Sequence, residues 1–188
     1  MNTDRIFIIS GPSGSGQDSV IERLAEIMPI ERVITSTTRP PRPGETSGAP
    51  YYFLSRDQFE SGIERGDFIE WAREYNDELY GVTKEELLRV AKSQSLGIWK
   101  MEYKGVITAK SLFPNIVAIL ITAPLESIEA RLRKRDDPTE AYLAERMTYT
   151  REWLNYTHIY DYTVENLDGK LEESVKKITE IIKERIRP

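Results

Sequence analysis

The most informative absences from this 188-residue chain concern sulfur, charge and long apolar runs. There is no cysteine, which excludes disulfides and thiolate metal sites. The 26 basic and 31 acidic residues give a net charge of -5, without the basic excess that is typical of nucleic-acid-binding proteins. No apolar run reaches membrane-spanning length and no signal-peptide pattern is present, so we expect a cytoplasmic protein without a membrane partner.

A further absence lies in a glycine-rich turn near the N-terminus. The segment follows the frame G-x-x-x-x-G-K-[ST], in which backbone N–H groups wrap a phosphate chain and a lysine neutralises its charge. Gln17 stands in the lysine position and Asp18 in the hydroxyl position, so the loop has lost a cation and gained an anion. A carboxylate is a hard oxygen ligand, which makes Asp18 a candidate for Mg²⁺. The candidate phosphate-binding residues are Gly11, Pro12, Ser13, Gly14, Ser15, Gly16, Gln17, Asp18 and Ser19.

The residues around this loop have the pattern of a buried strand followed by a helix. A strand and glycine turn that lead into a helix N-terminus direct free N–H groups and a positive dipole at a phosphate. Strand-like and helix-like segments then alternate, which predicts an α/β fold with a parallel sheet flanked by helices. The predicted strands of this sheet lie at 5–10, 96–102, 115–123 and 162–165, and apolar stripes at helical spacing lie at 20–28 and 171–182.

Two segments interrupt this alternation. The first contains a proline-rich loop, extended stretches at 33–35, 51–53 and 67–74, and capping boxes at Ser55 and Thr83. The second predicts two helices, broken at Asp136-Asp137-Pro138, that together form a flap. The predicted organisation is one domain over 1–188, comprising a core (about 1–32, 85–123 and 160–188), an insertion (about 33–84) and a lid (about 124–159).

The insertion also carries several separated motifs. These are Thr-Ser-Thr-Thr-Arg-Pro-Pro-Arg-Pro-Gly-Glu at 35–45, then Tyr51, Phe-Ile-Glu-Trp-Ala at 68–72 and Tyr-Gly at 80–81. In this order and spacing, and together with the loop frame, they resemble guanylate kinase over nearly the whole chain. The resemblance implies a P-loop NTPase-like fold with a monophosphate-binding insertion and a helical lid. It also implies phosphoryl transfer from ATP to GMP with Mg²⁺, in a monomer or homodimer.

Elementary chemistry agrees with an acceptor site in the insertion. Two arginines three residues apart, stiffened by prolines, can clamp a monophosphate with charge-assisted hydrogen bonds, and a tyrosine hydroxyl adds a donor. A buried carboxylate can accept from both the ring N–H and the amino group of guanine, and Glu70 matches that role in the family. Val82 replaces a hydroxyl residue that touches the base in the family, which predicts the loss of about 0.5–1.5 kcal/mol. The GMP-binding residues implied by the resemblance are Thr35, Arg39, Arg42, Tyr51, Glu70, Tyr80, Glu102 and Arg151.

The predicted flap resembles the family's lid over the donor nucleotide. Phosphoryl transfer spreads negative charge over equatorial oxygens, and arginines that converge on them supply much of the catalysis. By resemblance, Arg131, Arg135 and Arg146 are lid arginines, with Arg135 and Arg146 the stronger catalytic candidates beside Arg39. Asn166 matches a family position beside the adenine.

Besides the missing lysine of the phosphate loop, the chain departs from the family pattern at a second place. Where guanylate kinases place two aspartates one residue apart after a core strand, this chain has Lys100 and Glu102. The carboxyl end of a parallel strand beside the loop points into the crevice that holds the phosphates. We therefore hypothesise that Lys100 replaces the missing loop lysine and that Asp18 takes over metal binding.

Three interpretations remain open at this point. The first is an active guanylate kinase with a rearranged phosphate site, and the second is a guanylate-kinase-like binding module without turnover. The third is a related small-molecule kinase, because the residues after the loop glycines also resemble ribose 1,5-bisphosphokinase. The arginine pair and Glu70 argue against the third interpretation.

Overall fold

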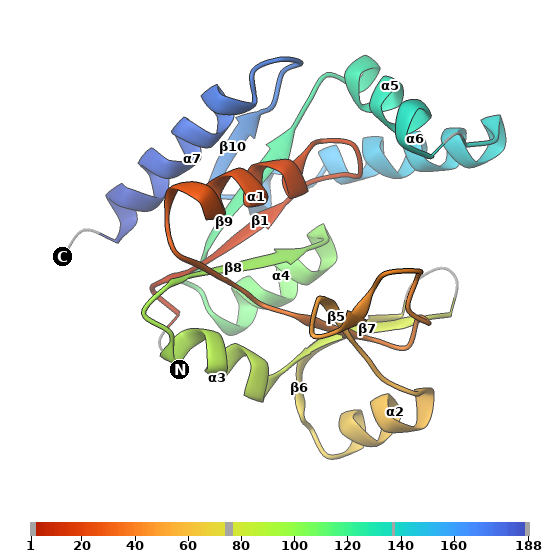
Figure 1. The fold of residues 1–188 in the computed structure, drawn as a ribbon, viewed down its shortest axis with the longest axis vertical. Helices are drawn as coiled ribbons and strands as arrows, with labels where there is room; N and C mark the ends of the chain where they lie inside the picture. The colour runs from red at the N-terminus through yellow and green to blue at the C-terminus, as the bar shows by residue number, and fades with distance from the viewer. Residues whose placement is uncertain (1–2, 74–76, 137, 187–188) are drawn as a thin grey trace.

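A parallel sheet forms the centre of the fold in the computed structural model, which describes residues 3–73, 77–136 and 138–186 (Figure 1). Five strands lie in the order β10-β9-β1-β8-β2, and each neighbouring pair runs parallel. The predicted α/β class is therefore confirmed. The strands are β1 (Ile6–Ser10), β2 (Ile30–Arg32), β8 (Leu96–Met101), β9 (Val117–Thr122) and β10 (Tyr162–Glu165).

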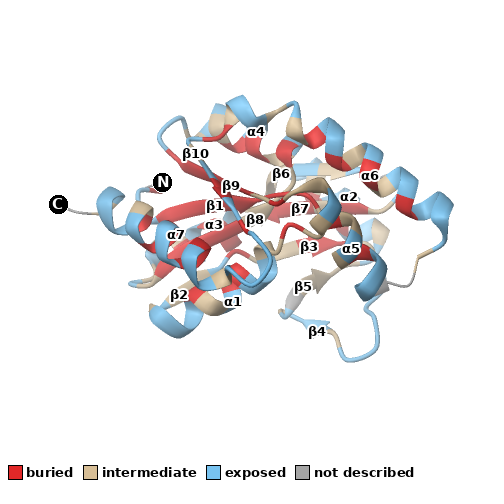
Figure 2. Ribbon diagram, turned by 90° about the horizontal axis from the view of Figure 1, so that it is seen from above, coloured by how far each residue is buried: buried red, intermediate tan, exposed pale blue. Residues whose placement is uncertain are grey.

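Helices bury both faces of this sheet, as Figure 2 shows by the buried strands between them. The side chains of β1 alternate, so that Ile6 and Ile8 enter one core cluster while Phe7 and Ile9 enter the other. Helices α1 (Gln17–Ile27) and α7 (Leu171–Arg185) pack on the Phe7 side. Helices α3 (Lys84–Lys92) and α4 (Tyr103–Leu112) pack on the other side. The same alternation along β8 places Lys100 on the face of Ile98, toward α1.

A second sheet lies to one side of the first (Figure 1). Its order is β4-β5-β3-β7-β6, with β3 parallel to β5 and antiparallel to β7. This register pairs Thr35 with Tyr51 and Thr37 with Tyr80, which brings three of the predicted GMP-binding residues onto adjacent strands. The elements are β3 (Thr35–Thr37), β4 (Thr46–Ser47), β5 (Pro50–Phe53), α2 (Arg56–Glu64), β6 (Phe68–Arg73) and β7 (Leu79–Thr83).

Helices α5 (Leu125–Asp136) and α6 (Glu140–Leu154) form an arm with a small apolar cluster of its own. The base of this α5–α6 arm is fixed to the core beyond the short 3-10 helix η1 (Thr157–Ile159). Trp153 Nε1 donates to the hydroxyl of Tyr160 at 3.0 Å, and that hydroxyl lies 2.8 Å from Ser10 Oγ. This buried chain joins α6 directly to the end of β1.

The sequence reading missed or misplaced several elements. Helix α4 was not predicted, because Gly, Val, Ile and Thr weaken its helix propensity, although Tyr103, Val106 and Ala109 are buried at helical spacing. The capping box at Ser55 is complete, whereas Thr83 caps α3 without the reciprocal bond, because the Glu86 carboxylate accepts from Ile34 N instead. The extended stretch expected at 33–35 joins β2 to β3.

The strand predicted over 67–74 is β6, and its last residue, like position 137 of the predicted helix break, lies outside the described residues.

Candidate functional site

The glycine-rich loop connects β1 to α1 as predicted. Gly14 and Gly16 have φ angles of 87° and 92°, a left-handed conformation that favours glycine. A side chain at position 16 would also have its Cβ 2.2 Å from Asn166 Nδ2. The loop's carbonyls are held from outside, because Asn166 Nδ2 donates to Ser15 O at 2.9 Å and Arg131 donates to Gly14 O at 3.0 Å. Within the loop, Ser15 N donates to Pro12 O at 3.0 Å, so the turn is closed by its own backbone as well.

Gln17 turns back onto the loop instead of extending from it. Its side-chain Nε2 donates to Gly11 O, which is how an uncharged residue can occupy the lysine position without leaving that carbonyl unpaired. Its Oε1 and the hydroxyl of Ser15 are buried without a hydrogen-bond partner among the described residues. The loop therefore keeps its backbone frame but contributes no cation at position 17.

Lys100 reaches the loop from the neighbouring strand. Its Nζ lies 2.7 and 2.8 Å from the two carboxylate oxygens of Asp18, across 82 residues of sequence. Strand β8 lies beside β1, with Lys100 opposite Ile9, so its side chain leaves the sheet next to the start of α1. Arg32 Nη2 is 3.4 Å from the same carboxylate. Lys100 thus lies at the sheet edge beside the loop, where the sequence analysis placed it, while the ion pair with Asp18 was not predicted and the roles of both residues stay predictions.

A pocket of about 230 Å³ lies on the outer side of the loop. Arg131 forms one wall, where its guanidinium donates to Asn166 O at 2.8 Å and to Asp168 Oδ1 at 2.7 Å. Both Arg131 and Asn166, which sequence reasoning placed near the donor nucleotide, thus line one pocket beside the loop. The lining residues are Gly16, Ser19, Arg131, Asn166, Leu167, Asp168, Gly169 and Leu171.

The predicted monophosphate clamp lies on the second sheet. The guanidinium of Arg39 packs over the rings of Tyr51 and Phe53, at 5.4 and 5.5 Å from their centroids. Its Nη2 also pairs with Glu45 at 2.8 and 3.1 Å, and the Arg42 N–H donates to that carboxylate at 2.7 Å. Glu45 thus fixes both the side chain of Arg39 and the backbone of Arg42. The ring of Tyr80 stands edge-on to that of Tyr51 with their centroids 6.0 Å apart.

The electrostatics of this side of the site differ from those of the loop. Burial raises the pKa of Glu70 to about 7, so this carboxyl is poised near neutrality. Burial also raises the pKa of Tyr51, and the neighbouring Tyr80 adds to the effect. The negative charge of Asp18 makes a smaller contribution in the same direction, and the positive charge of Arg39 opposes it.

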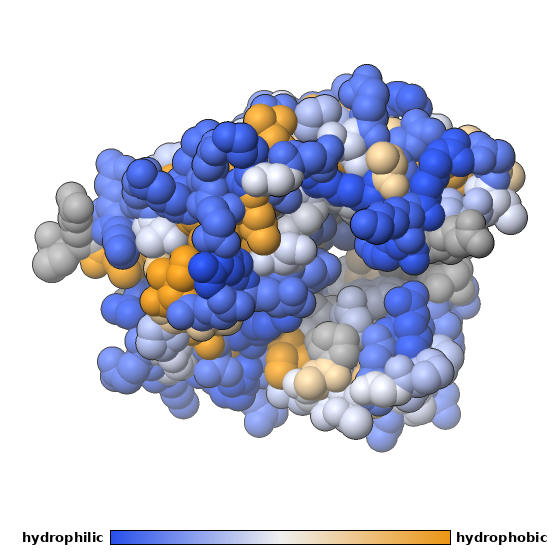
Figure 3. Space-filling view, turned by 45° about the horizontal axis from the view of Figure 1, so that its top comes forward, coloured by the Kyte–Doolittle hydropathy of each residue, from blue (hydrophilic) through white to orange (hydrophobic). Residues whose placement is uncertain are grey.

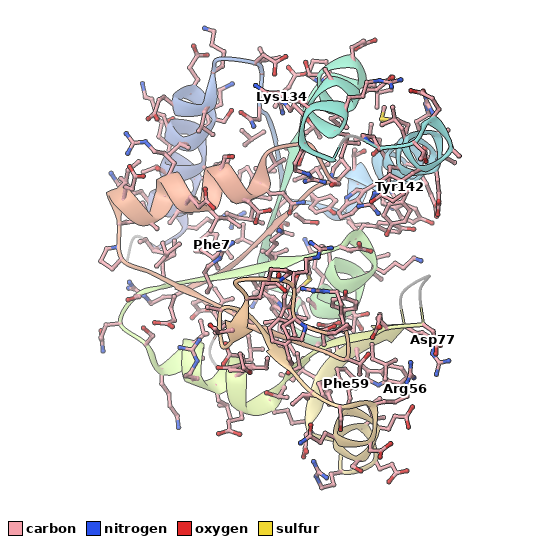
Figure 4. The ribbon with its side chains drawn as sticks, turned by 45° about the vertical axis from the view of Figure 1, so that its right-hand side comes forward. Phe7, Arg56, Phe59, Asp77, Lys134 and Tyr142 are labelled. Carbon is pink, nitrogen blue, oxygen red and sulfur yellow. The ribbon has the colours of Figure 1, made fainter. Side chains whose placement is uncertain are left out.

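The predicted lid arginines are distributed along the α5–α6 arm. Arg135 donates to Ser13 Oγ at 3.1 Å, so it already contacts the loop. Arg146 lies over the ring of Tyr142 at 5.9 Å, and Arg151 is exposed on the last turns of α6. Tyr142 and Lys134 mark the arm in Figure 4, across from Asp77 at the outer end of the second sheet. Figure 3 shows the surface hollowed between these two parts.

The resemblance implies a magnesium ion, whose ligands would come from oxygen atoms beside the loop. Among the described residues, no group of three or more acidic or histidine side chains forms a cage for a metal. A single carboxylate such as Asp18, completed by phosphate oxygens and water, suits Mg²⁺, which keeps much of its hydration in phosphoryl-transfer sites. The residues present therefore fit a metal that arrives with a nucleotide.

Comparison with known proteins supplies the family. The model of the guanylate kinase family matches residues 3–185. The chain belongs to the guanylate kinase family. It is 37% identical to the guanylate kinase of Idiomarina loihiensis over 170 residues, which cover 87% of this chain and 79% of that protein. The guanylate kinase of Caldanaerobacter subterraneus is 35% identical over 179 residues, covering 94% and 85% of the two chains.

Solved structures give the same fold. The crystal structure of guanylate kinase from Anaplasma phagocytophilum aligns with a TM-score of 0.73 and 26% identity, over 97% of this chain and 86% of that one. Shikimate kinase from Acinetobacter baumannii aligns at 0.52 with 14% identity, over 97% and 95%, which shows a shared fold alone. In the described part of this guanylate kinase family member, no helix is long and apolar enough to cross a membrane.

Some contacts of this guanylate kinase site were not found from the sequence. Glu45 belongs to the motif at 35–45, but the sequence analysis gave it no role, and its carboxylate holds the clamp. Tyr149 donates to Glu102 at 2.5 Å, and no motif in the sequence indicates this contact. Val82 is fully buried and pairs with Glu70 across strands β6 and β7, so it lies beside the carboxyl that is expected to bind the base. The loss of a base contact at Val82 stays a prediction.

Proposed function

We propose that this chain transfers the γ-phosphoryl group of ATP to GMP, giving ADP and GDP, with Lys100 as the cation that its phosphate loop lacks. One contact carries the proposal: Lys100 Nζ reaches both carboxylate oxygens of Asp18, at the loop's own helix N-terminus. A cation at this point needs only a rotation of its flexible side chain to meet a phosphate beside the loop. The family membership supports the overall reaction.

The acceptor half would be built from the second sheet. Arg39 and Arg42, with the hydroxyls of Tyr51 and Tyr80, bind the monophosphate, and Glu45 holds the Arg39 side chain and the Arg42 backbone in this loop. Glu70, Thr35 and Glu102 bind the nucleoside, and the buried carboxyl of Glu70 accepts from guanine once it is ionised. Arg151 is exposed on the last turns of α6, and its part in this half stays a prediction.

The donor half would be built from the loop, β8 and the arm. The loop N–H groups hold the phosphate chain, while Arg131 and Asn166 border the pocket for the donor nucleoside. Lys100, Arg135 and Arg146 neutralise the charge that spreads over the transferred group. Mg²⁺, when bound through Asp18 and the phosphates, supplies further neutralisation. No covalent intermediate is required, because positioning and charge account for this chemistry.

The Lys100–Asp18 pair also explains how both charges are kept in place. In the structure each neutralises the other, so neither a lone cation nor a lone anion stands beside the loop. A phosphate chain with its metal offers a partner of opposite sign to both at once. The pair would then separate, with Lys100 moving to phosphate oxygen and Asp18 to the metal.

A coupled assay of ADP release tests the proposal and separates it from its alternatives. We expect turnover with GMP and dGMP, and none with AMP or ribose 1,5-bisphosphate. Turnover only with the ribose bisphosphate would identify the related small-molecule kinase. No turnover with any acceptor, together with retained GMP binding in calorimetry, would identify a binding module whose Lys100 and Asp18 cancel one another.

A further inference from the structure

The hydroxyl of Tyr149 joins the α5–α6 arm to the end of strand β8. It donates to Oε2 of Glu102 at 2.5 Å. Glu102 is the N-cap of α4, yet its side chain makes no capping hydrogen bond. Among the residues that the structure describes, the other oxygen, Oε1, has no hydrogen-bond partner. Tyr149 is therefore the contact that orients this carboxylate and leaves one oxygen available.

The position of the Tyr149 hydroxyl is fixed by packing. The ring lies against Tyr103 and Trp153, with centroids 6.0 and 5.8 Å away. Trp153 is itself buried and donates to Tyr160 at 3.0 Å, which anchors this part of α6 to the core. A tyrosine has only two side-chain torsions, so packing on two sides leaves its hydroxyl little freedom. The hydrogen bond to Glu102 is thus held by a rigid support.

Glu102 lies where the acceptor nucleoside is expected. It follows β8 at the carboxyl edge of the central sheet, the edge from which the phosphate loop also leaves. Helix α4, which Glu102 starts, packs against β6, the strand that carries Glu70. The carboxylates of Glu70 and Glu102 therefore come from two adjoining elements beside one site.

On the basis of the proposed function, we propose that Tyr149 is a positioning residue for base specificity, which holds Glu102 so that Oε1 accepts from the exocyclic amino group of guanine. A carboxylate held by one donor at Oε2 presents an acceptor at Oε1 and no donor. Guanine satisfies that acceptor, whereas hypoxanthine has the same ring N–H but no amino group. A site with an acceptor left unpaired binds the analogue less well.

Calorimetric titration of GMP and IMP into the wild type and Tyr149→Phe tests this role. We expect the substitution to weaken GMP binding about five- to tenfold, because Glu102 loses its orienting hydrogen bond, and to change IMP binding less than about twofold. Tyr156→Phe is the matched control, since Tyr156 stacks on Tyr103 at 4.4 Å in the same cluster and its hydroxyl makes no hydrogen bond to another described residue. That control should leave both affinities unchanged.

A double substitution separates positioning from general loss of structure. Glu102→Ala should remove the same GMP preference, and adding Tyr149→Phe to it should cause no further loss. Equal weakening of GMP and IMP in Tyr149→Phe, or no change in either, would overturn the inference while the proposed function stands. A wild-type protein that binds neither nucleotide would overturn both.

Discussion

The two halves of the site obtain their positive charge in different ways. At the acceptor half, Arg39 is largely buried, stacks on two aromatic rings and is held by Glu45 within the same loop. At the donor half, the loop itself supplies no cation, and Lys100 arrives from another strand as one side of a half-exposed ion pair. The acceptor half therefore depends on local side chains, whereas the donor half depends on the pairing of β8 with β1.

This difference shows which parts of a phosphate-binding site can vary in sequence and which cannot. The backbone of the loop is constrained by its glycines and by the contacts of Asn166 and Arg131 to its carbonyls. A charge on a long side chain is less constrained, because any neighbouring strand end within reach can provide it. A bidentate clamp for a monophosphate has no such freedom, since its geometry is set by two arginine forks.

The largest effect is expected at Lys100. In Lys100→Ala the kcat for ADP release should fall about a thousandfold, because a charge that neutralises the transferred phosphoryl group is lost. Lys110→Ala is the matched control, since Lys110 also forms an ion pair, with Asp161 at 2.8 Å, but on α4. If Lys100→Ala released ADP as fast as Lys110→Ala, the donor half would not obtain its positive charge from Lys100.

A rescue experiment sharpens the same point. Adding Gln17→Lys to Lys100→Ala returns a cation to the loop. We expect the kcat of this double variant to be at least about tenfold higher than that of Lys100→Ala. An unrelated lysine, introduced by Gln94→Lys at an exposed position between α3 and β8, serves as the control in the same background.

The next largest effect is expected at the clamp. Arg39→Lys keeps the charge but removes the planar fork and its stacking on Tyr51, so KM for GMP should rise about 10- to 100-fold while KM for ATP stays unchanged. Arg56→Lys on α2, which loses only exposed pairs with Glu60 and Asp77, should change neither constant. An equal rise in the KM for GMP and the KM for ATP would show that Arg39 contributes to both the acceptor half and the donor half.

A pH dependence of about tenfold is expected from Glu70. Burial raises the pKa of this carboxyl to about 7, and guanine needs the ionised form as an acceptor. GMP affinity should therefore increase from pH 6 to pH 8 by about tenfold, as expected for one linked proton. In Glu70→Gln this component disappears while the titration of the GMP phosphate remains, so the difference between the two profiles isolates Glu70. Parallel profiles would contradict the assignment.

The smallest effect is expected at Asp18. Asp18→Asn keeps an oxygen ligand but removes its charge, so the Mg²⁺ concentration for half-maximal rate should rise about three- to tenfold. Asp57→Asn, at an exposed helix position on α2, is the matched control. A reduced kcat with an unchanged Mg²⁺ dependence would show that Asp18 only holds Lys100.

Much of this arrangement was predictable because it depends on local or periodic signals. The loop frame, strands β1 and β9 and helix α7 follow from glycine positions and apolar spacing. The position of Lys100 beside the phosphate loop followed from one topological rule, that the carboxyl ends of neighbouring parallel strands share an edge, whereas its ion pair with Asp18 was not predicted. The roles of the site residues and the boundaries of insertion and lid stay predictions.

The remaining contacts were not predictable because they join distant residues through ordinary side chains. Glu86 is a buried carboxylate that accepts from Ile34 N at 2.7 Å, although 52 residues separate the two positions and no motif connects them. Tyr149 and Glu102 are 47 residues apart in the sequence. Nothing in the sequence around Tyr149 distinguishes it from an ordinary surface or core tyrosine on a helix. Contacts of this kind depend on the packing angle of helices, which spacing alone does not give.

The hydrogen bonds that hold the loop from outside have a consequence for the order of folding. Residues 11–16 are made early in synthesis, but Ser10 is tied to Tyr160 and Ser15 to Asn166, 150 and 151 positions later. Contacts of such sequence separation form late, because the chain between them must first be ordered. The phosphate loop would therefore reach its native conformation only after nearly all of the chain has left the ribosome. ATP could then bind only to a chain that is almost completely folded.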